Sequence, residues 1–260
     1  MELPAYLEQG QGDTAIFLLH GVGGGKEAWT RNQPALAAQG FRTIAWDMPG
    51  YGASLPLATC SNAALAGALK TLIVQIGAQR NVLLGHSMGG MIAQELAALH
   101  PELVHGLVLH STSPAFGKGD GAWQQQFLQS RFEPLDQGLG MAGLAKQLVP
   151  GMFAPDADPA LIAEAAALMG QVPEASYRAA LSAIVSFNRL ADLGRIAVPT
   201  LCLAGELDHN APPAVVEKMA SRIGDAEYVC LPGAGHIANI ETPDLFNQTV
   251  LSFLKKHFPS

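Results

Sequence analysis

Short, almost continuous apolar runs alternate along this chain with longer segments of helical periodicity. The apolar runs are Ala15–Leu19, Thr43–Trp46, Val82–Leu84, Leu107–Leu109, Thr200–Ala204 and Tyr228–Leu231. Strands that are buried on both faces have this character, because helices cover each side of a parallel sheet. Between them, Ala63–Ile76 and Met88–Leu99 repeat their apolar residues at helical spacing. Strand and helix in alternation predict an α/β fold with a mostly parallel central sheet flanked by helices.

The alternation stops between residues 113 and 196. This stretch has few strand signals, and prolines separate four amphipathic segments that predict helices at 123–132, 139–148, 160–169 and 175–187. A crossover needs only about a dozen residues, so a longer helical insert between two sheet strands predicts a cap over one end of the sheet. We therefore expect an α/β core domain of residues 1–112 and 197–260, and a helical cap, or lid, of residues 113–196.

Composition narrows the classes of function. The 260 residues are 49% hydrophobic and 14% charged, which predicts a sizeable buried core. A formal charge of −7 argues against nucleic-acid binding, which needs Lys and Arg on phosphates. The chain has no apolar run long enough to span a membrane and no secretory leader pattern, so we expect a cytoplasmic protein with no membrane partner. Cys60, Cys202 and Cys230 lack metal or redox spacing, and we expect no metal and no cofactor.

The most specific motif is GHSMGG at Gly85–Gly90, which directly follows an apolar run and opens the predicted helix at Met88. A GxSxG sequence between a strand and a helix is typical of a tight turn that presents a nucleophilic serine. Bulky side chains two places on either side of Ser87 would collide, and the two glycines remove them. The helix N-terminus offers N–H groups and a partial positive charge to a developing oxyanion. The motif predicts that Ser87 is a nucleophile at the carboxyl edge of the sheet.

A serine hydroxyl needs a base, and the base needs an acid that orients it. His236 lies in a glycine-rich loop just after the last apolar run, and Asp208 follows the run before it by a few residues. Both therefore leave strand ends at the edge where Ser87 is expected. The predicted catalytic residues are Ser87, Asp208 and His236. Glu206 is a nearby alternative for the acid, and His209 for the base.

Acyl transfer also needs two N–H donors for the tetrahedral oxyanion. Met88, directly after the nucleophile, supplies one. The second is expected from the glycine-rich loop His20–Gly25 after the first buried run, where we predict the N–H of Val22. These glycines do not form a phosphate-binding motif, because Lys26 is not followed by Ser or Thr and no GxGxxG is present.

With these residues in place, the sequence resembles the α/β-hydrolase family over essentially its whole length. The matching pieces, in chain order, are His20–Gly21, the D-x-P-G-x-G-x-S loop Asp47–Ser54, Gly85–Gly90, Gly205–Asp208 and Gly235–His236. The resemblance implies that Ser87 attacks a carbonyl, His236 takes and returns the proton, and Asp208 holds His236. It also implies that the Val22 and Met88 N–H groups bind the oxyanion, and that Asp47 anchors its loop without a catalytic role.

Within the family, the chain is most similar to 3-oxoadipate enol-lactonases and related carboxylesterases, on Gly89–Gln94, Asn188–Leu193 and Glu241–Pro243. This resemblance implies a serine hydrolase that cleaves a small carboxylic ester or lactone through an acyl-enzyme, in the catabolism of aromatic compounds. The same features occur in hydrolases that cleave a carbon–carbon bond of meta-cleavage diketones, which is the main alternative. A non-catalytic binding protein of this fold and cofactor-free dioxygenation are remote alternatives. The motifs leave the oligomeric state open.

Specificity is expected to depend on the cap. Its candidate pocket walls, each of which is more often a core residue, are Phe127, Phe132, Met141, Met152, Phe153, Met169, Tyr177 and Phe187. Arg131, Arg178 and Arg189 could bind a substrate carboxylate through two parallel hydrogen bonds, although a solvated or salt-bridged helix face is the more usual place for each.

Overall fold

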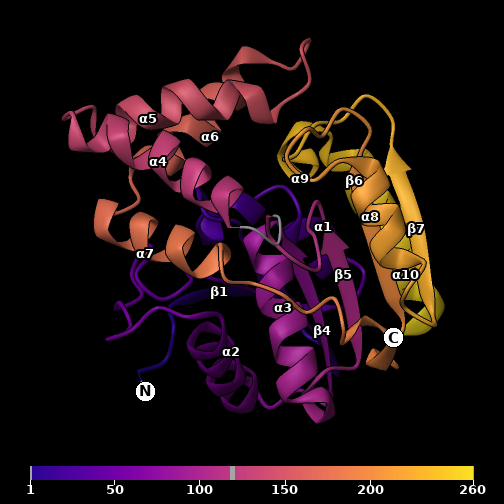
Figure 1. Cartoon of the computed structure of the whole chain (residues 1–260). Coiled ribbons are helices and arrows are strands. Elements are labelled where there is room, and N and C mark those ends of the chain that lie inside the picture. The colour runs from indigo at the N-terminus through magenta and orange to yellow at the C-terminus, as the bar shows by residue number, and fades with distance from the viewer. Residues whose placement is uncertain (1, 118–120, 260) are drawn as a thin grey trace.

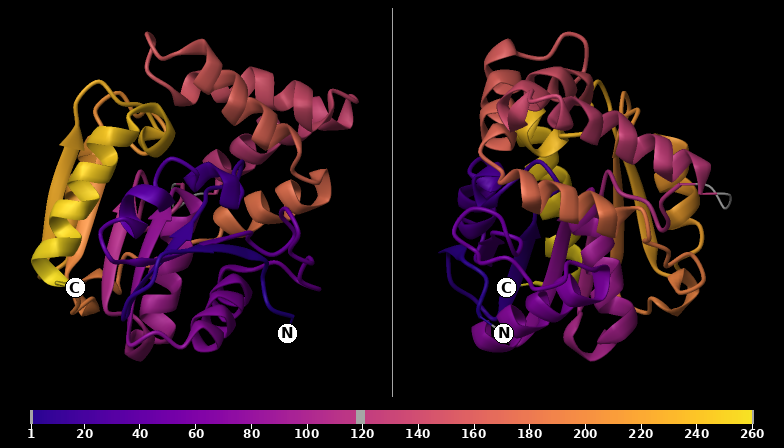
Figure 2. Two further views of the ribbon diagram at one scale, coloured as in Figure 1. Left: turned by 180° about the vertical axis from the view of Figure 1, so that it is seen from behind. Right: turned by 60° about the vertical axis from the view of Figure 1, so that its left-hand side comes forward.

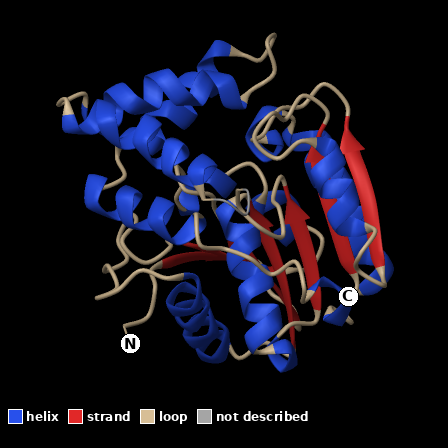
Figure 3. Ribbon diagram, in the orientation of Figure 1, coloured by secondary structure: helices blue, strands red, loops and turns tan. Residues whose placement is uncertain are grey.

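A seven-stranded sheet forms the centre of the protein (Figures 1 and 3), whose computed structural model describes residues 2–117 and 121–259. In spatial order the strands are β1 (Tyr6–Gln9), β3 (Arg42–Trp46), β2 (Thr14–Leu19), β4 (Arg80–His86), β5 (Gly106–His110), β6 (Thr200–Gly205) and β7 (Ala226–Leu231). Only β1 is antiparallel to its neighbour, and every other described pair is parallel. The predicted α/β fold is confirmed, and each predicted apolar run lies in one of the strands β2–β7.

The sequence pattern did not predict β1. This strand is four residues long, and three of its four residues are exposed, so it carries no apolar run. It pairs with the edge of the sheet through β3, in the register Tyr6 opposite Trp46. Backbone hydrogen bonding, which the side-chain pattern does not report, is what places it there.

Helices cover both faces of the sheet. On one face pack α2 (Asn62–Ile76), α3 (Met88–Leu99) and α8 (Pro213–Ala220), and on the other pack α1 (Gln33–Ala37), α9 (Ala238–Glu241) and α10 (Pro243–His257). Successive strand residues point to opposite faces, so Phe17 is buried in the first core and Leu18 in the second. This double burial explains why the strands are continuous apolar runs.

Four helices lie between β5 and β6 in the chain: α4 (Ala122–Asp136), α5 (Gly140–Leu148), α6 (Pro159–Gly170) and α7 (Glu174–Ile184). They confirm the four predicted helices of this region. Figures 1 and 2 show α4, α5 and α6 beyond the carboxyl ends of the parallel strands. The division into a core domain and a cap stays a prediction, and Met1, residues 118–120 and Ser260 of those predicted domains lie outside the described residues. None of the described helices is long and apolar enough to cross a membrane.

Candidate active site

Ser87 occupies a strained turn between β4 and α3. Its φ of 51° and ψ of −115° are uncommon for any residue with a side chain. A Cβ atom on Gly85 would lie 2.5 Å from the backbone of Gly89, and one on Gly89 would lie 2.1 Å from the carbonyl oxygen of Leu19. Real Cβ atoms do not come this close to backbone, so both positions require glycine. The predicted strand–turn–helix geometry around Ser87 is therefore present.

His236 and Asp208, which are far apart in the sequence, meet at this edge of the sheet. Nδ1 of His236 lies 2.8 Å from Oδ2 of Asp208. The other carboxylate oxygen accepts hydrogen bonds from the N–H groups of Asn210 and Ala211, at 2.8 and 3.0 Å. Because an ionised carboxylate only accepts, the imidazole donates from Nδ1 and keeps the lone pair of Nε2 free. This is the tautomer that a general base needs.

The carboxylate of Asp208 is shielded from solvent, and burial alone would raise its pKa. The hydrogen bond and charge of His236, together with the two backbone N–H groups, outweigh burial and hold the pKa of Asp208 below its ordinary value. Asp208 is therefore ionised at neutral pH. The alternative acid, Glu206, is exposed and accepts instead from the N–H of Gly233 at 2.8 Å, while the alternative base, His209, is exposed as well.

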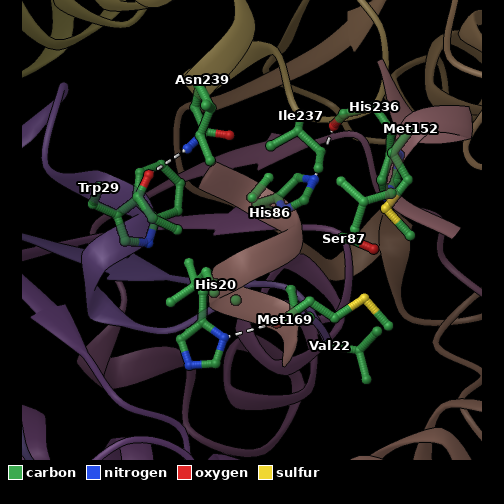
Figure 4. Close-up of a pocket in the computed structure, with 18 residues that line it drawn as sticks. His20, Val22, Trp29, His86, Ser87, Met152, Met169, His236, Ile237 and Asn239 are labelled. Atoms are coloured by element: carbon green, nitrogen blue, oxygen red, sulfur yellow. Dashed lines mark hydrogen bonds between the residues drawn. The ribbon is translucent and has the colours of Figure 1, made fainter. Parts of the chain in front are cut away.

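Two cavities adjoin Ser87 and His236. The first, called here the narrow cavity, has a volume of about 60 Å³ and is lined by residues such as His20, Trp29 and Met169 (Figure 4). The second, called here the wide cavity, has a volume of about 330 Å³ and extends beneath α4 and α7. Both cavities include Ser87 and His236 in their walls. A substrate held across this junction would place one group in each cavity.

The walls of these cavities differ in part from the predicted ones. Of the candidate cap residues, Phe127, Met152, Met169 and Tyr177 line a cavity, whereas Phe132, Met141, Phe153 and Phe187 line neither and pack in or against the core. Helical spacing cannot separate these two roles, because both give an apolar residue on the inner face of a helix. Two aromatic walls of the wide cavity, Phe116 and Trp123, were not among the predicted residues. Within the described residues, no three His, Cys, Asp or Glu side chains gather as metal ligands.

The predicted oxyanion donors come from two different segments, the start of α3 and the loop after β2. Met88 is the first residue of α3, where helical N–H groups have no partner within the helix. Val22 lines both cavities, and its carbonyl oxygen accepts a hydrogen bond of 2.9 Å from the Tyr51 hydroxyl. The adjacent His20 accepts from the N–H of Met48 at Nε2 and donates from Nδ1 to Gly21, at 3.0 and 2.7 Å. The loop that carries Val22 is thus held by the loop after β3.

Asp47 anchors that second loop. Its carboxylate accepts hydrogen bonds from the Lys26 N–H at 3.0 Å, the Lys26 ammonium at 2.6 Å and the Ala53 N–H at 3.0 Å. All three donors are in the two loops that the carboxylate joins, and Asp47 lines none of the cavities beside Ser87. The geometry is that of a loop anchor.

The ring of His86 packs in tilted contacts against two other histidine rings. The ring of His86 lies 4.9 Å from that of His110 and 4.8 Å from that of His236, and its Nε2 donates to the His236 carbonyl oxygen at 2.9 Å. Burial, reinforced by the other two rings, holds the pKa of His86 well below its ordinary value. Burial likewise lowers the pKa of His20, and it lowers that of His110 to about 3. The rings of His20, His86 and His110 are therefore neutral in the folded protein.

Acid should therefore destabilise the fold through these histidines. The unfolded chain protonates a histidine near pH 6.5, so unfolding takes up protons below that pH. His110, whose pKa in the folded protein is about 3, contributes stability that is fully present above about pH 7, and the free energy of unfolding falls by about 2 kcal/mol through this one residue between pH 7 and pH 5. Urea titrations at the two pH values measure the difference. His110→Gln should show a smaller difference, and the exposed His209→Gln should not. Equal differences in wild type and His110→Gln would contradict this account.

Glu241 joins the segment before α6 to the loop of His236. One carboxylate oxygen accepts from the N–H of Ala154 and the other from the N–H of Gly235, each at 2.7 Å. The N–H of His236 itself donates to the carbonyl of Met152 at 2.7 Å. A Cβ on Gly235 would lie 2.6 Å from that same carbonyl oxygen, so the two segments touch backbone to backbone. No local sequence pattern predicts this link.

Glu241→Gln should weaken activity by loosening the base. The amide offers one accepting oxygen where the carboxylate offers two, so one of the two N–H groups loses its partner. We expect kcat to fall by about 10-fold with KM little changed, because a displaced base affects the chemical step more than binding. Steady-state kinetics measure this split. Glu217→Gln, an exposed glutamate on α8, serves as the control, and a change in KM alone would contradict the positioning role.

Known proteins resemble this chain over most of its length. The family model described as "alpha/beta hydrolase fold" matches residues 14–243. A pimeloyl-[acyl-carrier protein] methyl ester esterase of Yersinia enterocolitica is 29% identical over 95% of both chains. A 2-hydroxy-6-oxononadienedioate/2-hydroxy-6-oxononatrienedioate hydrolase of a Pseudomonas species is 30% identical, over 96% of this chain and 90% of its own.

A solved structure extends the likeness to three dimensions. The enol-lactonase of Burkholderia xenovorans LB400 superposes with a TM-score of 0.86 and 27% identity, over 96% of each chain. This likeness covers almost the whole of the fold described above. This protein is a hydrolase, and the chain belongs to the α/β-hydrolase family.

Proposed function

We propose that this hydrolase cleaves a small carboxylic ester or lactone through an acyl-enzyme formed on Ser87. The observation that carries the proposal is the pair of His236 and the ionised Asp208, buried beside a strained serine where two cavities meet. Ser87 acts as the nucleophile and His236 as the general base. Asp208 is the carboxylate that orients His236. The esterase and enol-lactonase relatives support the same chemistry.

In the first half-reaction the Ser87 oxygen attacks the carbonyl carbon while Nε2 of His236 takes the hydroxyl proton. Asp208 stabilises the imidazolium that forms. The N–H groups of Val22 and Met88 stabilise the negative oxygen of the tetrahedral intermediate. His236 then gives its proton to the leaving oxygen, and the carbon–oxygen bond breaks to leave the acyl-serine. Water, activated by the same imidazole, hydrolyses the acyl-serine and restores the hydroxyl of Ser87.

Carbon–carbon cleavage of a meta-cleavage diketone is the second candidate. It is favoured by the Pseudomonas relative, whose name describes such a hydrolase. The same serine, base and oxyanion donors would serve it. Ile237, directly after the base, is aliphatic where an aromatic residue is often expected in carbon–carbon hydrolases. We therefore place ester and lactone hydrolysis first.

A substrate panel separates the two candidates. Purified enzyme is assayed with p-nitrophenyl acetate, with 3-oxoadipate enol-lactone and with a yellow ring-fission diketone. The proposal expects turnover of the ester or the lactone, with the diketone chromophore left unchanged. Loss of the yellow chromophore without ester or lactone turnover would replace the proposal by carbon–carbon hydrolysis. Turnover of the enol-lactone is also the result that would support a role in the catabolism of aromatic compounds.

A further inference from the structure

Arg131, on α4, has a guanidinium edge that no described residue fills. Its Nη1 donates to the Phe127 carbonyl at 3.3 Å and to the Ser130 hydroxyl at 2.8 Å. Nε and Nη2 have no acceptor within residues 2–117 and 121–259. These two nitrogens form the side of the guanidinium that binds a carboxylate through two parallel hydrogen bonds. Arg131 therefore presents an unused carboxylate-binding fork.

In two other arginines of this region, Nε and Nη2 already donate to carboxylates. Nε and Nη2 of Arg189 donate to the two carboxylate oxygens of Glu95, each at 2.7 Å. Nε of Arg178 donates to Glu174 at 2.9 Å, and its Nη2 donates to Asp136 at 2.6 Å. Neither of these arginines lines the wide or the narrow cavity. Of the three arginines that the sequence offered for a substrate carboxylate, only Arg131 is both unpaired and at a cavity.

The part of the wide-cavity wall that the structure describes offers no acidic side chain to balance the charge of Arg131. Arg131 lines the wide cavity together with Ser87 and His236, and no Asp or Glu is among the described residues of that cavity wall. The guanidinium carbon lies 3.7 Å from the centre of the Phe127 ring, which fixes the plane of the fork. Burial lowers the pKa of Arg131, and Tyr177 offsets this only in part. A partly desolvated cation without an acid partner favours an anionic ligand.

We infer that Arg131 binds a carboxylate of the substrate, so that the preferred substrates are esters or lactones with a free carboxylate at the end away from the reacting carbonyl. This inference rests on the proposed function and adds the substrate class to it. The carboxylate-bearing part occupies the wide cavity beside Arg131. The narrow cavity, with a volume of about 60 Å³, takes the small uncharged group on the other side of Ser87.

A matched pair of esters tests the inference. Monomethyl adipate carries a free carboxylate, and dimethyl adipate has the same chain without it. For Arg131→Gln we expect kcat/KM for the half-ester to fall about 10- to 100-fold and kcat/KM for the diester to change little, because a charge-assisted bidentate contact is lost. Arg131→Lys, which keeps the charge but not the fork, should lie between. Arg178→Gln is the matched control, since that arginine is already paired.

A binding measurement makes the result independent of turnover. Calorimetric titration of the uncleaved half-ester and diester is repeated in a Ser87→Ala background, with and without Arg131→Gln. Selective binding of the half-ester that disappears with Arg131→Gln is expected. Equal binding of both esters, or equal losses on both in Arg131→Gln, would overturn the inference. Selective binding without ester turnover by the wild type would instead count against the proposed function and leave the anion site standing.

Discussion

Replacing Ser87 by alanine will reduce kcat/KM for ester hydrolysis by at least about 10⁴-fold, because no acyl-enzyme can then form. The other contributions, from the oxyanion donors and from the substrate contacts, remain in place and account for residual activity. Initial rates with p-nitrophenyl acetate measure the loss. A fluorophosphonate reagent supplies a second readout, since it should add mass to the wild type at Ser87 and leave the variant unmodified.

Ser111 offers the matched control for this change. It is buried directly after β5, lines the wide cavity as Ser87 does and, with a φ of 48°, shares the positive φ of Ser87. Ser111→Ala should keep kcat/KM within about threefold of wild type, which shows that removing a buried, strained hydroxyl is not itself the cause. Equal rates for Ser87→Ala and wild type, with a normally folded variant, would rule out Ser87 as the nucleophile.

Asp208→Asn is expected to have the second largest effect, a loss of about 10³- to 10⁴-fold in kcat. The asparagine amide can donate to Nδ1 of His236, which would move the imidazole proton to Nε2 and remove the lone pair that accepts the serine proton. The substitution keeps the shape of the side chain. The effect should therefore lie in kcat, with KM and the far-ultraviolet circular dichroism spectrum little changed.

Glu206→Gln tests whether Asp208, and not the neighbouring Glu206, is the acid that orients His236. Glu206 lies two residues from Asp208, but its carboxylate holds the backbone of Gly233. Glu206→Gln should cost little activity, because the glutamine oxygen can still accept this one N–H. The reverse ranking, with Glu206→Gln inactive and Asp208→Asn active, would transfer the role of the acid to Glu206.

The sequence predicts those parts of the fold and site that depend on local pattern. Double burial of the strands produces continuous apolar runs, and the turn at Ser87 demands glycines at fixed positions, so both leave a readable signal. No helix after residue 196 was predicted, although α10 buries Phe246, Val250, Phe253 and Leu254 at helical spacing. That signal was present and was not used.

Contacts between distant side chains leave no such signal. The carboxylate of Glu241 meets the N–H of Ala154 across 87 positions of the chain, and nothing local to either residue indicates it. The sequence does not indicate the unpaired edge of Arg131 either. Acidic side chains reach Arg178 and Arg189 in the folded protein, whereas none of the described ones reaches Arg131. Long-range packing decides these cases, and the three arginines look alike in the sequence.

The link between residues 152–154 and the His236 loop has a consequence for chimeric enzymes. Exchanging lids between members of this family is an obvious route to new specificity. In this protein a graft that replaces Met152 and Ala154 also replaces the backbone partner of the His236 N–H and that of the Glu241 carboxylate. Donor segments should therefore stop before Val149, or should keep a backbone that accepts from the His236 N–H and donates to Glu241.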